Sequence, residues 1–159
     1  MKENYLSKCT LLYVEDDENI RNMLKKRLEK KVKNIYIACD GVEGLAKFNE
    51  LRPDIILTDV SMPKMNGIDM SRHIKEIDNN VPIVISSAHG DTKYLIESIE
   101  LGINGYLFKP IDKIKLFEIL EKNVKTVLIE QKLIEQKNKN NLDRKNKRRQ
   151  SKNDTRRCD

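Results

Sequence analysis

The sequence lacks any long apolar run, and its first ten residues, MKENYLSKCT, contain no hydrophobic stretch of the kind found in secretion signals. A membrane-spanning helix needs roughly 18 or more consecutive apolar residues, and no window of this chain approaches that length. We therefore expect no membrane span and a cytoplasmic location.

Cysteine is also scarce. The three cysteines, Cys9, Cys39 and Cys158, lie far apart and form no C-x-x-C pair. An odd number at such spacing argues against a disulfide framework or a zinc site. It agrees with a reducing compartment, where thiols stay free.

Charge is unevenly distributed along the chain. Residues 121–159 contain 13 Lys and Arg against 6 Asp and Glu, whereas residues 1–120 contain 18 against 19. The net charge of +6 therefore comes from the C-terminal part. The larger N-terminal part is nearly neutral.

Short apolar runs alternate with longer amphipathic segments from residue 10 onward. Strands are expected at 10–14, 34–39, 54–58, 82–86 and 105–109, and helices at 18–30, 40–51, after Gly67, near 91–101 and from about Asp112. Continuous apolar strands are typical of parallel sheets covered on both faces. The pattern predicts an α/β fold: a doubly wound, flavodoxin-like five-stranded parallel sheet, order 2-1-3-4-5, with five helices and the last one extended into a basic tail.

The inner faces of two helices are expected from apolar spacing. In the helix at 18–30, the side chains on one face are Ile20, Met23, Leu24 and Leu28. In the last helix, Ile114, Phe117 and Leu120 should face the core.

Polar side chains lie at the ends of all five expected strands, and Asp40, after the second, is explained by its role as a helix cap. Glu15 and Asp16 follow the first strand, Asp59 the third and Ser87 the fourth, while Lys109 is the last residue of the fifth. Each alone is more often a helix cap, a turn residue or a strand terminator than a functional residue. In open parallel sheets, however, the carboxyl ends of the strands meet at the functional edge, so these side chains should converge.

Converging carboxylates repel each other, by roughly 4 kcal/mol for two charges about 4 Å apart at an effective dielectric near 20. A divalent cation relieves this repulsion, and an all-oxygen site with few protein ligands favours Mg²⁺. A lysine and a hydroxyl complete a set that suits phosphoryl groups. The chemistry that it permits is phosphoryl transfer onto the carboxylate of Asp59.

Four longer motifs carry a family resemblance. They are VEDDENIR at 14–21, DIILTDVSMPKMNGIDM at 54–70, PIVISSAHGD at 82–91 and GINGYLFKPID at 102–112. Over about residues 8–125 the chain resembles the receiver domain, of the chemotaxis-regulator type, of two-component system response regulators. The resemblance implies phosphorelay signal transduction, with Asp59 accepting phosphate from a sensor histidine kinase or a phosphotransfer protein. It implies no conventional enzyme, because the domain catalyses only its own phosphorylation and dephosphorylation.

The resemblance also implies a metal site. Asp16 would bind Mg²⁺ directly, Glu15 mainly through water, and Asp59 and the backbone carbonyl of Ser61 would contribute oxygens; Mn²⁺ can substitute. The acidic pair could instead be Asp16 and Asp17, although the family pattern after the first strand favours Glu15 and Asp16.

Further roles follow from the same resemblance. Ser87 and Tyr106 would be the switch residues, and they would remodel the face made by the helix near 91–101, the strand at 105–109 and the last helix, where a downstream protein binds. Ser61 and His89 would tune the lifetime of the phosphoryl group. The peptide bond before Pro110 would be cis.

The C-terminal part divides into two further segments. Residues 126–137 are expected to be a helical extension or linker, either a homodimer seam or a solvated helix. Residues 138–159 are basic, cannot bury a core, and are expected to be disordered. Their run RKNKRRQ (144–150) could attract nucleic acid, but no aromatic residues interleave with it, which favours a solvated linker. The alternative function is the receiver part of a DNA-binding transcriptional regulator whose output domain is missing or replaced by this tail.

Overall fold

The computed structural model describes residues 3–88 and 90–157. The strands are β1 (Thr10–Val14), β2 (Asn34–Ala38), β3 (Ile55–Asp59), β4 (Ile83–Ser87) and β5 (Gly105–Phe108). The helices are the short η1 (Leu6–Lys8), α1 (Glu18–Leu28), α2 (Gly41–Leu51), α3 (Gly67–Ile77), α4 (Thr92–Leu101) and α5 (Lys113–Arg157).

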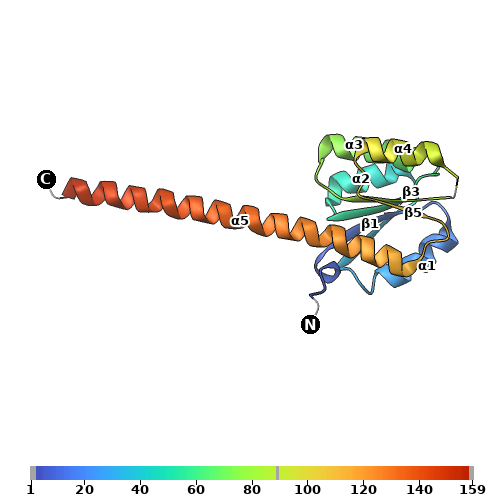
Figure 1. Ribbon diagram of the computed structural model, residues 1–159, viewed down its shortest axis with the longest axis horizontal. Coiled ribbons are helices and arrows are strands. Elements are labelled where there is room, and N and C mark those ends of the chain that lie inside the picture. Colours follow the sequence, from blue (N-terminus) through green and yellow to red (C-terminus); the bar gives the residue numbers. More distant parts are fainter. Residues whose placement is uncertain (1–2, 89, 158–159) are drawn as a thin grey trace. The chain divides into compact units, whose positions relative to one another are not determined.

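The five strands form one parallel sheet in the order β2-β1-β3-β4-β5. Helices α2, α3 and α4 cover one face, and α1 and the first turns of α5 cover the other (Figure 1). This arrangement confirms the predicted doubly wound fold. The chain forms two compact units, one up to Val127 and the other from Leu128. No helix among the described residues is long and apolar enough to cross a membrane.

The central strands are buried throughout, as their apolar runs predict. Every residue of β3 and β4 is buried. Successive strand residues point to opposite faces, so Leu12 and Val14 join Phe48 of α2 and Ile68 of α3 in one core cluster. The helices of the other face bury their own set, which consists of Leu24, Leu28, Leu116, Leu120 and Val124.

Two side chains that were predicted to face the core are exposed. Met23 is 54% exposed and Ile114 is 71% exposed. In each helix the buried residues are spaced i, i+4, and the series starts at another position: at Leu24, next to Met23, in α1 and at Leu116, two residues after Ile114, in α5. Ile114 precedes Leu116 by two residues and thus lies about 200° around the helix from it.

The prediction of a disordered tail does not agree with the structure. α5 continues to Arg157 and includes residues 138–157. The prediction rested on the inability of this segment to bury a core, and every residue from Ile129 to Arg157 is indeed exposed. Helix formation does not require burial here, because the segment contains no Gly or Pro and is rich in Lys and Arg, which are good helix formers.

The turn between β3 and α3 depends on a glycine. The backbone N–H of Gly67 donates to the carbonyl of Val60 at 2.8 Å. A Cβ at position 67 would lie 2.1 Å from the carbonyl oxygen of Asp59. The helix then begins with Asn66 as its cap, whose Oδ1 accepts from the N–H of Asp69 at 2.8 Å. The absence of a side chain thus lets α3 begin directly against the end of β3.

We predict that Gly67→Ala lowers the free energy of unfolding by about 1–3 kcal/mol, because the new methyl group collides with backbone that cannot move aside. Urea unfolding followed by circular dichroism measures the change. Gly44→Ala is the control. Its Cβ would meet side-chain atoms of Met70 and Val14 and no backbone of another segment within 4 Å among its three nearest atoms, and alanine favours the helix. An equal or larger loss in the control would contradict this account.

Candidate functional site

Four strands end at one edge of the sheet and place the predicted side chains there. Asp59 is the last residue of β3 and Ser87 the last of β4, while Glu15 and Lys109 directly follow β1 and β5. The register pairs Val14 with Thr58, Asp59 with Ser86 and Ser87 with Phe108. The strand exits are therefore level with one another, and their side chains meet.

Three carboxylates form the centre of this edge. Oxygens of Glu15, Asp16 and Asp59 lie within 4.8 Å of one another. Glu15 and Asp59 are buried, at 1% and 5% exposure, whereas Asp16 is exposed. Asp17 has a different role, because its Oδ1 accepts from the N–H of Ile20 at 3.0 Å and caps α1. Of the two acidic pairs considered, it is Glu15 and Asp16 that gather with Asp59.

Among the described residues, one ammonium group, that of Lys109, forms ion pairs with the buried carboxylates. Nζ of Lys109 lies 3.0 Å from Oδ2 of Asp59 and 3.4 Å from Oε2 of Glu15. One positive charge beside three carboxylates leaves an excess of negative charge at a largely buried site. The peptide bond between Lys109 and Pro110 is cis.

The protonation of these groups reflects burial and mutual repulsion. Burial, together with the charge of Asp59, raises the pKa of Glu15 to about 7, against the opposing charge of Lys109. Burial also raises the pKa of Asp59, again in opposition to Lys109. For Lys109, burial acts to lower the pKa, but the hydrogen bond and charge of Asp59 and the charge of Glu15 outweigh it and the pKa is raised. A further cation would relieve the strain on the two acids.

The acidic loop is held by a side chain of the following helix. Nη1 of Arg21 donates to the carbonyl oxygen of Glu15 at 2.9 Å and to that of Asp16 at 3.3 Å.

Ser61 is exposed in the loop after β3, two residues beyond Asp59. The start of this loop is fixed by Val60, whose N–H donates to the carbonyl of Ser86 at 3.1 Å.

Ser87 contacts a residue that the sequence did not single out. Its hydroxyl is buried and donates to Oδ2 of Asp91 at 2.9 Å. Asp91 is the N-cap residue of α4 but makes no side-chain cap bond to the helix. An acid four residues after the serine is the one signal that could have indicated this pair. The hydroxyl of Ser87 therefore connects the end of β4 to the start of α4.

Tyr106 packs against the core cluster on the side of the sheet covered by α2, α3 and α4. Its ring stacks edge-on with Phe108, with centroids 5.3 Å apart. Its hydroxyl is buried and has no hydrogen-bond partner among the described residues. His89 lies outside the described residues.

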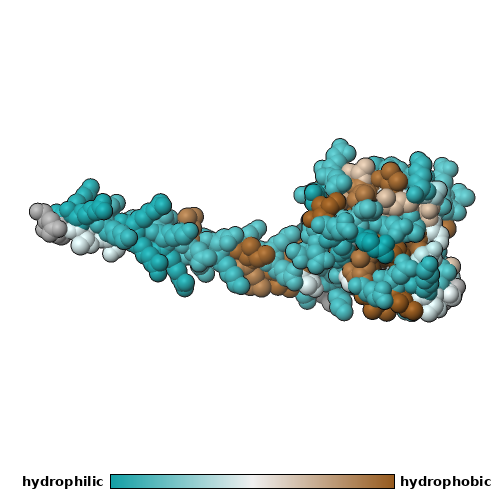
Figure 2. Space-filling view, turned by 90° about the horizontal axis from the view of Figure 1, so that it is seen from above, coloured by the Kyte–Doolittle hydropathy of each residue, from teal (hydrophilic) through white to brown (hydrophobic). Residues whose placement is uncertain are grey.

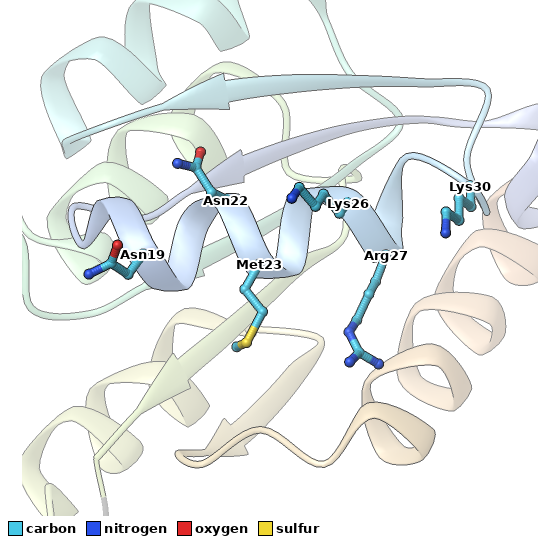
Figure 3. A pocket seen from close by; sticks show the side chains of 6 residues that line it. All are labelled: Asn19, Asn22, Met23, Lys26, Arg27 and Lys30. Carbon is cyan, nitrogen blue, oxygen red and sulfur yellow. The ribbon is translucent and has the colours of Figure 1, made fainter.

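Two adjoining hollows lie along α1. The first is lined by Asn19, Asn22, Met23, Lys26, Arg27 and Lys30 (Figure 3). The second is more apolar and is lined by Ile20, Met23, Leu24, Arg27, Lys109, Pro110, Ile111 and Lys113. Met23 and Arg27 line both hollows and point toward the segment that leads into α5 (Figure 3). An exposed hollow thus adjoins Lys109, a feature missed by the sequence because Met23 was placed in the core.

Comparisons with known proteins agree with this geometry. A family model described as the response regulator receiver domain matches residues 11–121. The chain is 37% identical over 113 residues to the chemotaxis protein CheY of Thermotoga maritima, which covers 70% of this chain and 94% of that protein. It is 35% identical over 120 residues to the transcriptional regulatory protein HptR of Staphylococcus aureus, covering 74% of this chain and 47% of HptR, and so spans about half the length of that relative.

Among solved structures, the N-terminal domain of an uncharacterized protein from Wolinella succinogenes superimposes with a TM-score of 0.72 at 36% identity. The match covers 76% of this chain and 98% of that one.

The raised pKa of Glu15 predicts how stability depends on pH in metal-free protein. The folded state holds the Glu15 proton more tightly than the unfolded state, whose pKa is near the ordinary value of 4.5. This contribution is complete below about pH 4.5 and is lost as the pH rises through about 7, a fall of roughly 3 kcal/mol at most. We expect the free energy of unfolding, measured with EDTA present, to decrease over this range. Glu15→Gln should flatten the decrease, and an unchanged slope in that variant would exclude Glu15 as its source.

Proposed function

The chain belongs to the response regulator receiver domain family, and from that premise we propose that Asp59 accepts a phosphoryl group from a histidine kinase or a phosphotransfer protein. The family is a signalling domain and not a conventional enzyme. The observation that carries the proposal is the buried carboxylate of Asp59, 3.0 Å from Nζ of Lys109 and clustered with two further acids. A nucleophilic carboxylate with adjacent positive charge is the arrangement that phosphoryl transfer onto an acid requires.

The transfer exchanges one bond for another. A carboxylate oxygen of Asp59 attacks phosphorus, and the bond between phosphorus and the donor imidazole nitrogen breaks with its electron pair leaving on nitrogen. Lys109, already beside Oδ2 of Asp59, neutralises negative charge on the transferring oxygens. Asp16 and Ser61, in the loops that border the site, are exposed, so a donor could reach this edge of the sheet from solvent.

The acidic cluster fits a magnesium ion. Its donors are all oxygens, they lie within 4.8 Å of one another, and Mg²⁺ prefers such ligands while keeping several waters. Glu15, Asp16, Asp59 and the backbone carbonyl of Ser61 would hold it, and Mn²⁺ would fit the same donors. When bound, the ion supplies positive charge against both the carboxylates and the transferring phosphoryl oxygens.

Phosphorylation would act on α4 through Ser87. Its hydroxyl now donates to Asp91 at the start of α4. A phosphoryl group on Asp59, one strand away, offers a stronger, charged acceptor for the same proton. Loss of the bond to Asp91 would release the start of α4 and allow Tyr106, whose hydroxyl has no partner among the described residues, to change position. The result is a switch of the α4–β5–α5 face for a downstream protein.

The phosphoryl donor would dock over the hollows beside α1. The more apolar of these hollows includes Lys109 in its lining, so a protein seated there lies next to the site of transfer. Exposed Met23 offers apolar contact, while Lys26 and Arg27 favour an acidic partner surface. Ser61, exposed two residues after Asp59, would influence the approach of water to the phosphorylated acid.

We predict that incubation with acetyl phosphate and Mg²⁺ adds one phosphoryl group, detected by intact mass, and that none is added with EDTA. Asp59→Asn should abolish the gain. Asp16→Asn should slow it at least tenfold at low Mg²⁺, with partial recovery at high Mg²⁺, because it removes a metal ligand but leaves the nucleophile. Phosphorylation of Asp59→Asn at the wild-type rate would refute the assignment of the nucleophile.

A second variant pair tests the switch. Ser87→Ala should still be phosphorylated, but the amide NMR shifts of α4 and β5 that accompany phosphorylation of the wild type should largely disappear. Ser86→Ala is the matched control, since Ser86 is equally buried in the same strand and the hydrogen bond to Asp91 comes from Ser87. Identical shift changes in both variants would contradict a role for the Ser87 hydroxyl.

A further inference from the structure

The second compact unit contains a strongly basic helical segment. Residues 137–157 are helical and exposed throughout. They include ten Lys or Arg but only two acids, Asp143 and Asp154. The surface of this part of the helix is almost entirely hydrophilic (Figure 2). The receiver chemistry at the sheet edge gives no reason for this charge.

The helix sorts these charges onto one face. With 3.6 residues per turn, each residue advances about 100°, so residues four apart lie nearly in line. Seven basic residues fall within an arc of about 140°, and we call them the basic stripe: Lys137, Arg144, Lys145, Arg148, Arg149, Lys152 and Arg156. Both acids lie on the opposite side, together with Lys139, Lys147 and Arg157.

The positive charges of the basic stripe are not neutralised by acidic side chains of the described residues. None of its side chains forms an ion pair with any described residue. Like charges at i, i+4 weaken a helix by a few tenths of a kcal/mol per pair, and Arg144, Arg148, Lys152 and Arg156 form an unbroken i, i+4 series. A polyanion laid along this face would remove the repulsion.

We propose that the basic stripe binds the phosphate backbone of duplex DNA. The series from Arg144 to Arg156 spans about 18 Å of helix, with a charge about every 6 Å, so it can contact several phosphates at once. An α-helix fits the major groove of B-form DNA, which is about 12 Å wide, whereas the major groove of duplex RNA is too narrow for it.

Other polyanionic surfaces fit less well. Binding in a membrane interface requires a continuous apolar face, and Leu142 is the one large apolar residue in 137–157. Single-stranded nucleic acid is held largely by stacking on aromatic rings, and the segment contains no aromatic residue. For a disordered tail, the absence of aromatic residues around residues 144–150 favours a solvated linker over nucleic-acid binding. For a helix on duplex DNA, phosphate contacts suffice.

The test is fluorescence anisotropy of the full chain with a labelled 25-base-pair duplex at several KCl concentrations between about 50 and 200 mM. The stripe variant carries Arg144→Gln, Arg148→Gln and Lys152→Gln. The control carries Lys139→Gln, Lys147→Gln and Arg157→Gln, which removes the same charge from the opposite face of the same helix. Far-UV circular dichroism of both variants shows whether the helix is retained.

We expect wild-type affinity to fall steeply with salt. The stripe variant should bind at least tenfold more weakly, with a salt slope reduced by about 3, because roughly 0.9 counterion is released per phosphate contact. The control should stay within about threefold of wild type. Equal weakening in both variants, or no salt-dependent binding by wild type, would overturn the proposal.

Two further measurements distinguish DNA binding from membrane binding and from the phosphorylation proposal, on which this proposal does not rest. Tighter binding to vesicles of phosphatidylserine and phosphatidylcholine than to DNA would also overturn it. Asp59→Asn should bind DNA as wild type does, because the basic stripe lies outside the phosphorylation chemistry; failure of one proposal is thus distinguishable from failure of the other.

Discussion

The mutual repulsion of three carboxylates at one sheet edge is the constraint on which the rest of the site depends. Glu15 and Asp59 are buried next to each other, which is unfavourable for charged groups unless they are paired. The surrounding fold holds them there: the strands that end at these acids are apolar and buried, and Arg21 fixes the acidic loop by its backbone. Lys109 compensates only part of the charge, so the site is predisposed to take up a cation.

The same edge connects the acids to distant elements through short links. Lys109 joins Asp59 to the end of β5, and Ser87 joins the neighbouring strand to the start of α4 through Asp91. Gly67 brings α3 against the carbonyl of Asp59 itself. Asp59 therefore contacts β5 through Lys109 and α3 through Gly67. Under the proposed function, a change of charge at Asp59 would reach α4 through Ser87 and Asp91.

The two compact units use charge in opposite ways. In the first unit, negative charge is concentrated, buried and partly paired with one lysine. In the second, positive charge is spread along an exposed helix face without pairing among the described residues. Buried charge acts at short range and is little affected by salt, whereas exposed charge is screened within about 10 Å at 0.1 M ionic strength. The ionic strength therefore acts chiefly on the second unit.

The sequence alone determined the fold and most of the site. Continuous apolar strands alternating with amphipathic helices indicate a doubly wound parallel sheet, and in such a sheet every strand exit lies at one edge, so Glu15, Asp59 and Lys109 had to meet. These are consequences of local pattern and of topology. Two further features depend on how separate segments pack, so only the tertiary structure decided them. One is that Asp16, and not Asp17, lies in the cluster with Glu15 and Asp59. The other is the hydrogen bond from Ser87 to Asp91.

The same distinction explains the errors. Met23 and Ile114 lie beside the buried stripes of their helices, and apolar spacing cannot tell the edge of a stripe from its centre before the neighbouring elements are placed. The tail was expected to be disordered because it has nothing to bury. Local helix propensity needs no burial, however, and once the segment is helical, its basic residues align on one face that the linear sequence does not display.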